Sequence, residues 1–128
     1  MLEKLRELSS HSQSKYYSFP VSCILECKDG SLFQGVNVET SSPAAGICAE
    51  RNALFQALAQ GYQKEDFVRI HIYSKSKNNI TPCFICRQAL LEYTPKTIEI
   101  ISYTDDGNKK KFSLEELCTY PFQEEDLK

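Results

Sequence analysis

Residues 48–74 read CAERNALFQALAQGYQKEDFVRIHIYS, and they contain the change from helix to strand on which the fold prediction depends. The first part, from Cys48 to about Gln60, is rich in Ala and Leu and is followed by Gly61, a pattern that predicts a helix and its carboxyl end. The last part, Phe67 to Ser74, alternates in side-chain character, which predicts a β-strand. A helix and a strand in so short a stretch indicate an α/β domain.

Two more strands are predicted on the amino-terminal side of this stretch. The runs from Pro20 to Cys27 and from Leu32 to Val38 are strand-like, and an Asp-Gly turn signal between them predicts a β-hairpin. Before the hairpin, leucines at positions 2, 5 and 8 form one apolar stripe on a short helix from Met1 to about Ser10. We expect this helix to pack on the outside of the core.

Helices and strands continue to alternate after residue 74. Pro82 favours the opening of a helix, which is predicted from Cys83 to about Tyr93. A fourth strand follows at Thr97 to Tyr103, and Lys109 to Phe112 forms a short fifth one. Residues 113–116, Ser-Leu-Glu-Glu, have the spacing of a capping box and predict a last short helix. We therefore expect a three-layer α/β/α fold around a central sheet of about five strands.

The composition indicates one globular domain over residues 1–128. Of these residues, 41% are hydrophobic and 25% are charged, an ordinary balance for a chain with one core. The formal net charge is −2 and the pI is about 5.7, which disfavours a nucleic-acid polymer as partner. No apolar run approaches the roughly 20 residues of a membrane helix, and no targeting segment is evident. We expect a cytoplasmic protein that does not enter a membrane.

Six cysteines in such a chain predict reduced thiols rather than a disulfide framework. Cys83 and Cys86 are three residues apart at the start of a predicted helix, so both sulfur atoms can reach a single ion. Such a pair also occurs in thiol redox sites and in structural zinc sites. Cys48, at the start of another predicted helix, is a third candidate ligand. The remaining thiols are assigned to packing: Cys23, Cys27 and Cys118.

Two helix amino ends can thus converge on one metal ion. Their free N–H groups and positive dipole ends stabilise thiolates, the form that binds metal. Three protein ligands leave the fourth position of a tetrahedral zinc ion to water, as in catalytic zinc sites. Glu50 lies about 200° around an ideal helix from Cys48, so the two side chains converge only if Cys48 precedes the helix. Glu50 is then either a general acid and base or only a favourable charge at the helix dipole.

At these residues the sequence resembles the cytidine deaminases, specifically the short, single-domain type that binds zinc through three cysteines. The resemblance runs from about residue 16 to residue 122. Its strongest segments are Gly35-Val36-Asn37-Val38-Glu39, Cys48-Ala49-Glu50-Arg51-Asn52-Ala53 and Pro82-Cys83-Phe84-Ile85-Cys86-Arg87-Gln88. It implies a cytidine-deaminase-like fold with a mixed sheet, and one Zn2+ per chain on Cys48, Cys83 and Cys86. Glu50 would move protons beside a zinc-activated water while cytidine or deoxycytidine loses its C4 amine as ammonia.

The resemblance also implies how a nucleoside is held. Asn37 and Glu39 match the Asn-x-Glu pair that binds ribose hydroxyls, and two residues apart on a strand they would point to one face. The backbone around Ala49 would hold the base, and Phe19 matches the aromatic residue that packs on it. Arg51 matches the arginine that hydrogen-bonds the zinc thiolates.

The implied assembly is a homotetramer with shared sites. Phe122 resembles the carboxy-terminal aromatic residue that reaches a neighbouring subunit's pocket. The sequence departs from the family pattern at Phe84, where Gly is usual, at Thr40, where Asn is usual, and at residues 22 and 23, where Ser-Cys replaces Gly-Ala. None of these departures is a predicted zinc ligand or the predicted proton carrier.

Other functions are compatible with parts of this pattern. The substrate could be another amino-heterocycle nucleoside, such as a nucleoside antibiotic or a modified base. A non-catalytic zinc module would need a fourth ligand from Cys23, Cys27 or a histidine, and neither His11 nor His71 lies in a ligand motif. A polynucleotide-editing deaminase should carry a basic groove, which an acidic chain does not suggest. The sequence does not rank cytidine against deoxycytidine.

Overall fold

A five-stranded mixed sheet forms the middle of the computed structural model, which describes all of residues 1–128. The strands are β1 (Val21–Cys27), β2 (Leu32–Val36), β3 (Phe67–Ser74), β4 (Glu99–Tyr103) and β5 (Lys109–Ser113). They lie in the order β2-β1-β3-β4-β5, and only β3 and β4 are parallel neighbours. The helices are α1 (Leu2–Ser9), α2 (Ala49–Ala59), α3 (Phe84–Tyr93) and α4 (Leu114–Leu117). The predicted fold class and order of elements are confirmed.

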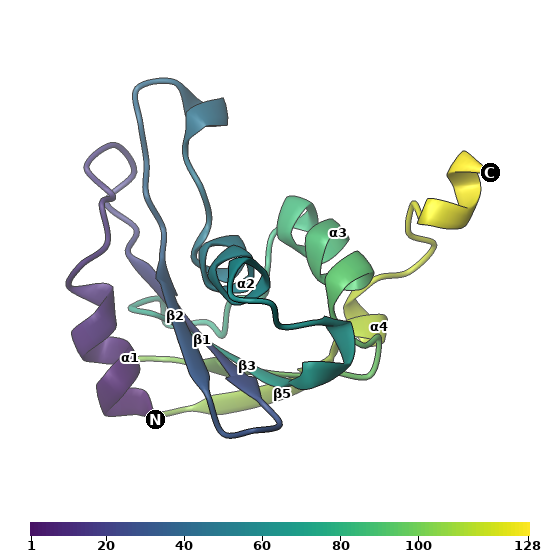
Figure 1. The fold of residues 1–128 in the computed structure, drawn as a ribbon. Coiled ribbons are helices and arrows are strands. Elements are labelled where there is room, and N and C mark those ends of the chain that lie inside the picture. The colour runs from purple at the N-terminus through teal and green to yellow at the C-terminus, as the bar shows by residue number, and fades with distance from the viewer.

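The helices cover the two faces of the sheet, which gives the three layers (Figure 1). On one face, α1 buries Leu5 completely against a small cluster that includes Ile24 and Tyr73. The hydroxyl of Ser22 donates to the Leu5 carbonyl at 2.8 Å, so this departure from the family pattern ties α1 to β1. On the other face, α2 and α3 lie over the main apolar core. None of these helices has the length and apolar character that crossing a bilayer requires.

The strand directions bring the starts of α2 and α3 together. β1 is antiparallel to both β2 and β3, so β2 and β3 run in the same direction and end at the same edge of the sheet. The chain passes from β2 to α2 and from β3 to α3, so both helices begin at that edge. In open α/β sheets, sites commonly form beyond the carboxyl ends of such strands.

Gly35 lets α2 lie directly against β2. A Cβ atom at this position would come within 2.3 Å of the Ala49 carbonyl oxygen and within 2.6 Å of the Ala53 amide nitrogen. Any other residue would therefore push the first turn of α2 away from the sheet. The side chain of Asn52 also fixes this turn, because its amide donates to the Val36 carbonyl at 3.0 Å.

The prediction that the second strand continues to Val38 was wrong, because β2 ends at Val36. Its last ladder pair joins Val36 to Ser22. Beyond this pair the Val21 N–H donates to the side-chain oxygen of Asn37 at 2.9 Å, and the Asn37 carbonyl accepts from the Gln13 N–H at 3.0 Å. Val38 instead forms isolated bridges with Gln13 and Ile47. Asn37 and Glu39 thus lie beyond the strand, and strand periodicity is not what orients them.

The sequence signals for the end of α2 and for the start of α4 are confirmed. Gly61 adopts φ +92° just after α2, the left-handed conformation expected at a helix carboxyl end. Ser113 and Glu116 form the predicted capping box, in which each side chain accepts from the other residue's N–H. All six cysteines are free, and Cys23 and Cys27 are buried in the core.

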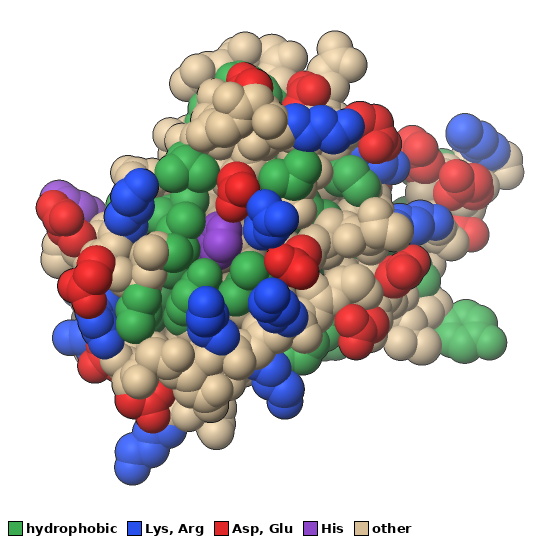
Figure 2. Space-filling model, turned by 90° about the horizontal axis from the view of Figure 1, so that it is seen from below, with side chains coloured by type: hydrophobic (Ala, Val, Ile, Leu, Met, Phe, Trp, Pro, Cys, Tyr) green, Lys and Arg blue, Asp and Glu red, His purple; other side chains and the backbone are tan.

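A buried histidine lies on the face of the sheet opposite α2 and α3. His71 Nδ1 is 2.9 Å from the Tyr103 hydroxyl, and its Nε2 is 3.1 Å from Glu26 Oε1. Figure 2 shows the molecule from below, where a histidine lies among hydrophobic and charged side chains. Burial lowers the pKa of His71, and the hydrogen bond from His71 lowers the pKa of Glu26. A neutral imidazole satisfies both partners if Tyr103 donates to Nδ1 and Nε2–H donates to Glu26.

This cluster predicts a loss of stability in mild acid. Because the pKa of His71 is lower in the folded chain than its unfolded value of about 6.5, the unfolded chain binds more protons as pH falls below that value. Lowering the pH from 7.5 to 5.5 is therefore expected to lower the melting temperature of the wild type relative to that of His71→Gln. The exposed His11 supplies the control, since His11→Gln should keep the wild-type pH dependence. An unchanged pH dependence in His71→Gln would contradict this account.

Candidate active site

Each of the two helices that begin at the shared sheet edge starts with a cysteine. Cys48 precedes α2 with φ −80° and ψ 156°, and Cys83 precedes α3 with φ −63° and ψ 165°. Both conformations are extended, and neither thiol caps its own helix. The helix predicted from Cys48 begins one residue later, at Ala49, so the condition for Cys48 and Glu50 to converge is met. Both cysteine side chains are therefore free to turn toward a common point.

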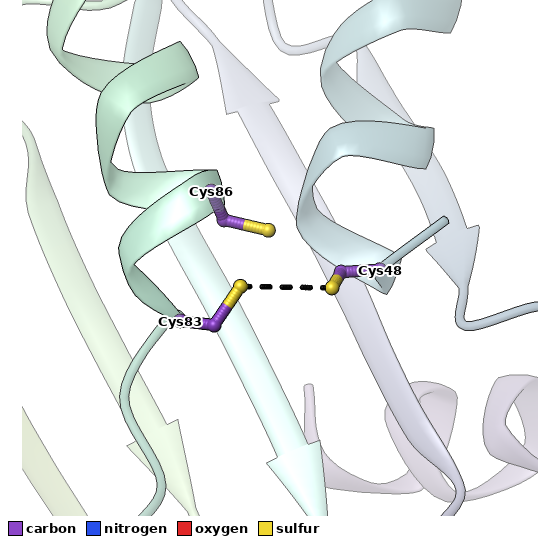
Figure 3. A group of neighbouring side chains, drawn as sticks. All are labelled: Cys48, Cys83 and Cys86. Carbon is purple, nitrogen blue, oxygen red and sulfur yellow. Dashed lines mark hydrogen bonds between the residues drawn. The ribbon is translucent and has the colours of Figure 1, made fainter. Parts of the chain in front are cut away.

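A third thiol joins them from the first turn of α3. The Sγ atoms of Cys48, Cys83 and Cys86 all lie within 4.8 Å of one another, and those of Cys48 and Cys83 are 3.7 Å apart (Figure 3). Sulfurs bound to one tetrahedral zinc ion at about 2.3 Å lie about 3.8 Å apart. Cys86 is buried, Cys48 is half-buried and Cys83 is exposed, so the cluster faces the core on one side only. The three thiols fit one zinc ion and leave one coordination position open.

The surroundings of Cys48 favour its thiolate, while the neighbouring Cys48 and burial raise the pKa of the Cys86 thiol. The Cys86 thiol and the Arg51 guanidinium, both hydrogen-bonded to Cys48, lower the pKa of the Cys48 thiol to about 5. Arg51 Nη2 lies 3.7 Å from Cys48 Sγ, as the resemblance implies for this arginine. The Nε atom of Arg51 is buried and has no hydrogen-bond partner in the chain. The guanidinium thus offsets part of the negative charge that three thiolates would bring.

Glu50 is a buried carboxyl group in the first turn of α2. Only 5% of the residue is exposed, and it forms no ion pair. Burial, with a smaller contribution from the nearby Cys48 thiolate, raises the pKa of Glu50 to about 7. A carboxyl with a pKa near neutrality can both take up and release a proton at physiological pH. A glutamate that only favoured the helix dipole would not need to be buried.

A cavity of about 430 Å3 opens beside Cys48 and Arg51. Its walls include Asn37, Glu39 and the apolar Ile85 of α3. Cavities of this size accommodate small organic ligands, with a few polar groups that set the orientation. The structure therefore brings the predicted sugar-binding pair to the cavity next to the metal cluster.

Main-chain groups hold Asn37 and Glu39 in place. Asn37 Oδ1 accepts from the Val21 N–H at 2.9 Å, and its Nδ2 donates to the Phe19 carbonyl at 2.9 Å. Glu39 Oε1 accepts from the N–H groups of Tyr16 at 2.8 Å and Tyr17 at 3.0 Å. One N–H of Asn37 and the second oxygen of Glu39 remain free for a ligand. The sequence did not predict the part played by residues 16 and 17, because backbone donors have no side-chain signature.

Other predicted residues lie outside this cavity. Ala49 is fully buried as the first residue of α2, and the ring of Phe19 is partly exposed but does not line the cavity. Phe122 lies over α3, where its carbonyl accepts from Gln88 Nε2 at 2.8 Å. The single chain therefore does not bring Phe19 or Phe122 to the cavity wall.

Two departures from the family pattern leave the metal cluster unobstructed. Phe84 is exposed and also lies outside the cavity, so its ring does not narrow it. Thr40 lines the cavity and forms a local turn, in which its hydroxyl accepts from the Ser42 N–H at 3.2 Å. The turn explains how a threonine can occupy a position where the family usually has asparagine.

Comparison with known families agrees with this geometry. A family model described as "Cytidine and deoxycytidylate deaminase zinc-binding region" matches residues 1–102, which contain all three clustered cysteines and Glu50. The chain belongs to this deaminase family. The resemblance inferred from the sequence is confirmed, and zinc is the metal that the three thiols of this deaminase fit.

Individual members of the deaminase family match nearly the whole chain. A cytidine deaminase of Mycoplasma genitalium is 31% identical over 123 residues, which cover 96% of this chain and 93% of the relative. A probable cytidine deaminase of Dictyostelium discoideum is 36% identical, with 98% and 86% covered. The crystal structure of cytidine deaminase from Burkholderia pseudomallei superimposes with a TM-score of 0.90 at 33% identity, covering 94% of this chain and 95% of that one.

The cluster predicts the metal content of the purified protein. We expect about one zinc per chain after dialysis against a weak chelator, because three thiolates at two helix amino ends bind zinc tightly. Cys83→Ser should lose most of the metal, whereas Cys118→Ser, outside the cluster, should keep it. Elemental analysis measures all three proteins. Full zinc occupancy in Cys83→Ser would show that Cys83 is not a ligand.

Proposed function

We propose that the protein is a cytidine deaminase that converts cytidine and 2′-deoxycytidine, with water, to uridine and 2′-deoxyuridine and ammonia. One observation carries the proposal: a buried carboxyl with a pKa of about 7 lies in the first turn of α2, two residues after Cys48 of the three-thiol cluster. The similarity to cytidine deaminases over nearly the whole chain supports this choice of substrate. A non-catalytic zinc module is disfavoured, because the cluster contains three protein ligands and no fourth.

Glu50 carries the protons in the proposed reaction. When bound, zinc supplies a Lewis acid that lowers the pKa of a water molecule toward neutrality. Glu50 takes up the two protons of the attacking water in turn, and it passes one to ring N3 and the other to the amine, which leaves C4 as ammonia. The burial that raises its pKa to about 7 suits both transfers, since the group is neither a strong acid nor a strong base at neutral pH.

Asn37 and Glu39 bind the sugar in this proposal. The free N–H of Asn37 donates to a sugar hydroxyl oxygen, and the free oxygen of Glu39 accepts a hydroxyl proton. The support is that both groups line the cavity while their other atoms are held by the main chain. A nucleoside sugar is thereby favoured over a free base. Ala49 and Phe19 remain the proposed contacts to the base.

The proposed cellular role follows from the substrate. Converting cytidine and deoxycytidine to uracil nucleosides is a step of pyrimidine salvage. We propose that residues 1–128 act as one deaminase domain in the cytoplasm, where six free thiols stay reduced. The two apolar clusters on the faces of one continuous sheet support the single domain.

We also propose a homotetramer in which subunits share sites. The support is a set of exposed apolar side chains around α2, α3 and the carboxyl end: Phe55, Phe84, Ile85 and Phe122. Surface groups of this kind commonly mark protein interfaces. Ile85, which is 66% exposed, also lines the cavity, so a neighbouring chain seated on α3 would border the substrate. Phe122 is proposed to reach the neighbouring cavity.

The reaction predicts a loss of ultraviolet absorbance when the zinc-loaded protein is mixed with cytidine or deoxycytidine. Glu50→Gln should keep its zinc but lose activity by about 10²-fold to 10⁴-fold, because the amide cannot carry protons. Glu7→Gln, on the exposed face of α1, is the matched control and should stay fully active. Bound zinc without turnover of either nucleoside would refute the substrate, and a fully active Glu50→Gln would refute the proton carrier. A side-by-side panel with other amino-heterocycle nucleosides tests the substrate class.

The assembly predicts a sedimentation mass of about four chains. Ile85→Glu should lower this mass, because a charge in a buried apolar contact costs several kcal/mol. Leu32→Glu, at the edge of the sheet, should leave it unchanged. A wild-type mass equal to one chain in the active enzyme would contradict the shared sites.

A further inference from the structure

Arg87, just after the zinc ligand Cys86, connects its own helix, α3, to two other parts of the chain. Its Nε donates to the Pro82 carbonyl at 2.7 Å, and its Nη2 donates to the Thr81 hydroxyl at 2.8 Å. Its Nη1 donates to the Leu117 carbonyl at 2.7 Å, at the carboxyl end of α4. The guanidinium thus connects α3 to α4 and to the two residues that precede Cys83.

The geometry of these contacts requires an arginine. The three acceptors lie in different directions around one planar group, and each receives its own N–H. A lysine carries one ammonium at the end of a flexible chain and cannot reproduce this fork. The positive charge also lies near the free carbonyls at the end of α4, where a cation is favourable. The ring of Phe84 covers the guanidinium, with its centroid 4.2 Å from the central carbon of Arg87.

Cys83 depends on this support more than the other two ligands do. Cys86 is buried in α3, and Cys48 contacts Arg51, whereas Cys83 is exposed. The Cys83 thiol does not cap its helix, so the helix start gives it no side-chain anchor. The peptide group that joins Pro82 to Cys83 is held through the Pro82 carbonyl, which Arg87 binds. The position of the Cys83 sulfur therefore depends on that hydrogen bond.

The loop from β3 has a second anchor farther back. Asn79 Nδ2 donates to the Ser102 carbonyl at 2.9 Å and to the Asn108 carbonyl at 3.1 Å. Residues 80–83 thus run between Asn79 at one end and Arg87 at the other. Loss of the Arg87 contacts would free the end of the loop that carries the metal ligand.

We propose that Arg87 is a positioning residue that locks the turn at residues 81–83 and holds the Cys83 sulfur in place for zinc, with Phe84 stacked over its guanidinium. The three guanidinium nitrogens of Arg87 all donate to groups of this chain, so it acts on the metal site through the chain. This inference rests on the three-thiol metal site and not on the identity of the substrate. Residues that orient metal ligands commonly change metal affinity by 10-fold to 100-fold when replaced.

The test is the rate of zinc release from the intact protein into an excess of a coloured chelator. Arg87→Lys is expected to release zinc at least about tenfold faster than the wild type. Thr81→Val, which removes one of the three contacts, should cause a smaller increase. In the double variant the two effects should not add, because both act on the same turn. Phe84→Leu should also increase the rate, by less than Arg87→Lys.

Arg69→Lys is the matched control. Arg69 forms ion pairs with Glu26 at 2.9 Å and Glu99 at 3.2 Å on the far face of the sheet. Like Arg87→Lys, this variant replaces a guanidinium that binds more than one partner. Its rate of zinc release should nevertheless stay within twofold of the wild type. Melting temperatures of the zinc-free proteins show how far each change affects general stability.

Each remaining outcome counts against the proposal. It is overturned if Arg87→Lys releases zinc within twofold of the wild type, or if Arg69→Lys accelerates release equally. If Arg87→Lys does not fold, the proposal is overturned instead by a Thr81→Val variant that releases zinc at the wild-type rate. A wild type that binds no zinc would refute the metal site itself and is distinguished by elemental analysis. Because the Arg87 nitrogens bind groups of this chain, KM of the zinc-loaded variant should be unchanged.

Discussion

Cys48, Cys83 and Cys86 can meet only because α2 and α3 begin at the same edge of the sheet. That edge is shared because β1 runs antiparallel to both β2 and β3. The two free helix amino ends then face one point, where their dipoles favour negative charge and hence thiolates. The metal cluster is thus a consequence of strand direction, and one of its members, Cys48, also lines the cavity that would hold a substrate.

Close packing turns this arrangement into a defined site. Gly35 lets the first turn of α2 rest on β2, which buries Glu50 and raises its pKa to about 7. On the other helix, Arg87 ties the chain before Cys83 to α3 and α4. The start of α2, just after Cys48, is therefore fixed by the absence of a side chain at Gly35, and the chain before Cys83 is fixed by the long side chain of Arg87. In both cases the main chain that carries the ligand is what is held.

Much of this could be predicted from the sequence, because the relevant signals are local. Hydrophobic periodicity and turn residues indicated the order of elements, and cysteines at two helix starts indicated the metal ligands. The end of β2 was missed because it depends on hydrogen bonds from Val21 and Gln13 to Asn37. The anchoring of Glu39 by backbone N–H groups, and the partners of Arg87 and His71, could not be predicted either. These contacts join residues far apart in sequence, and no local pattern records them.

The central claim is that zinc is held by three protein sulfurs with one position left open. X-ray absorption at the zinc edge of the purified protein measures the ligand set directly. The account predicts three sulfurs at about 2.3 Å and one lighter oxygen or nitrogen atom at about 2.0 Å. A shell of four sulfurs would mean a closed structural site, and a shell of two would mean that one of the three cysteines is not a ligand. Either result would contradict the claim.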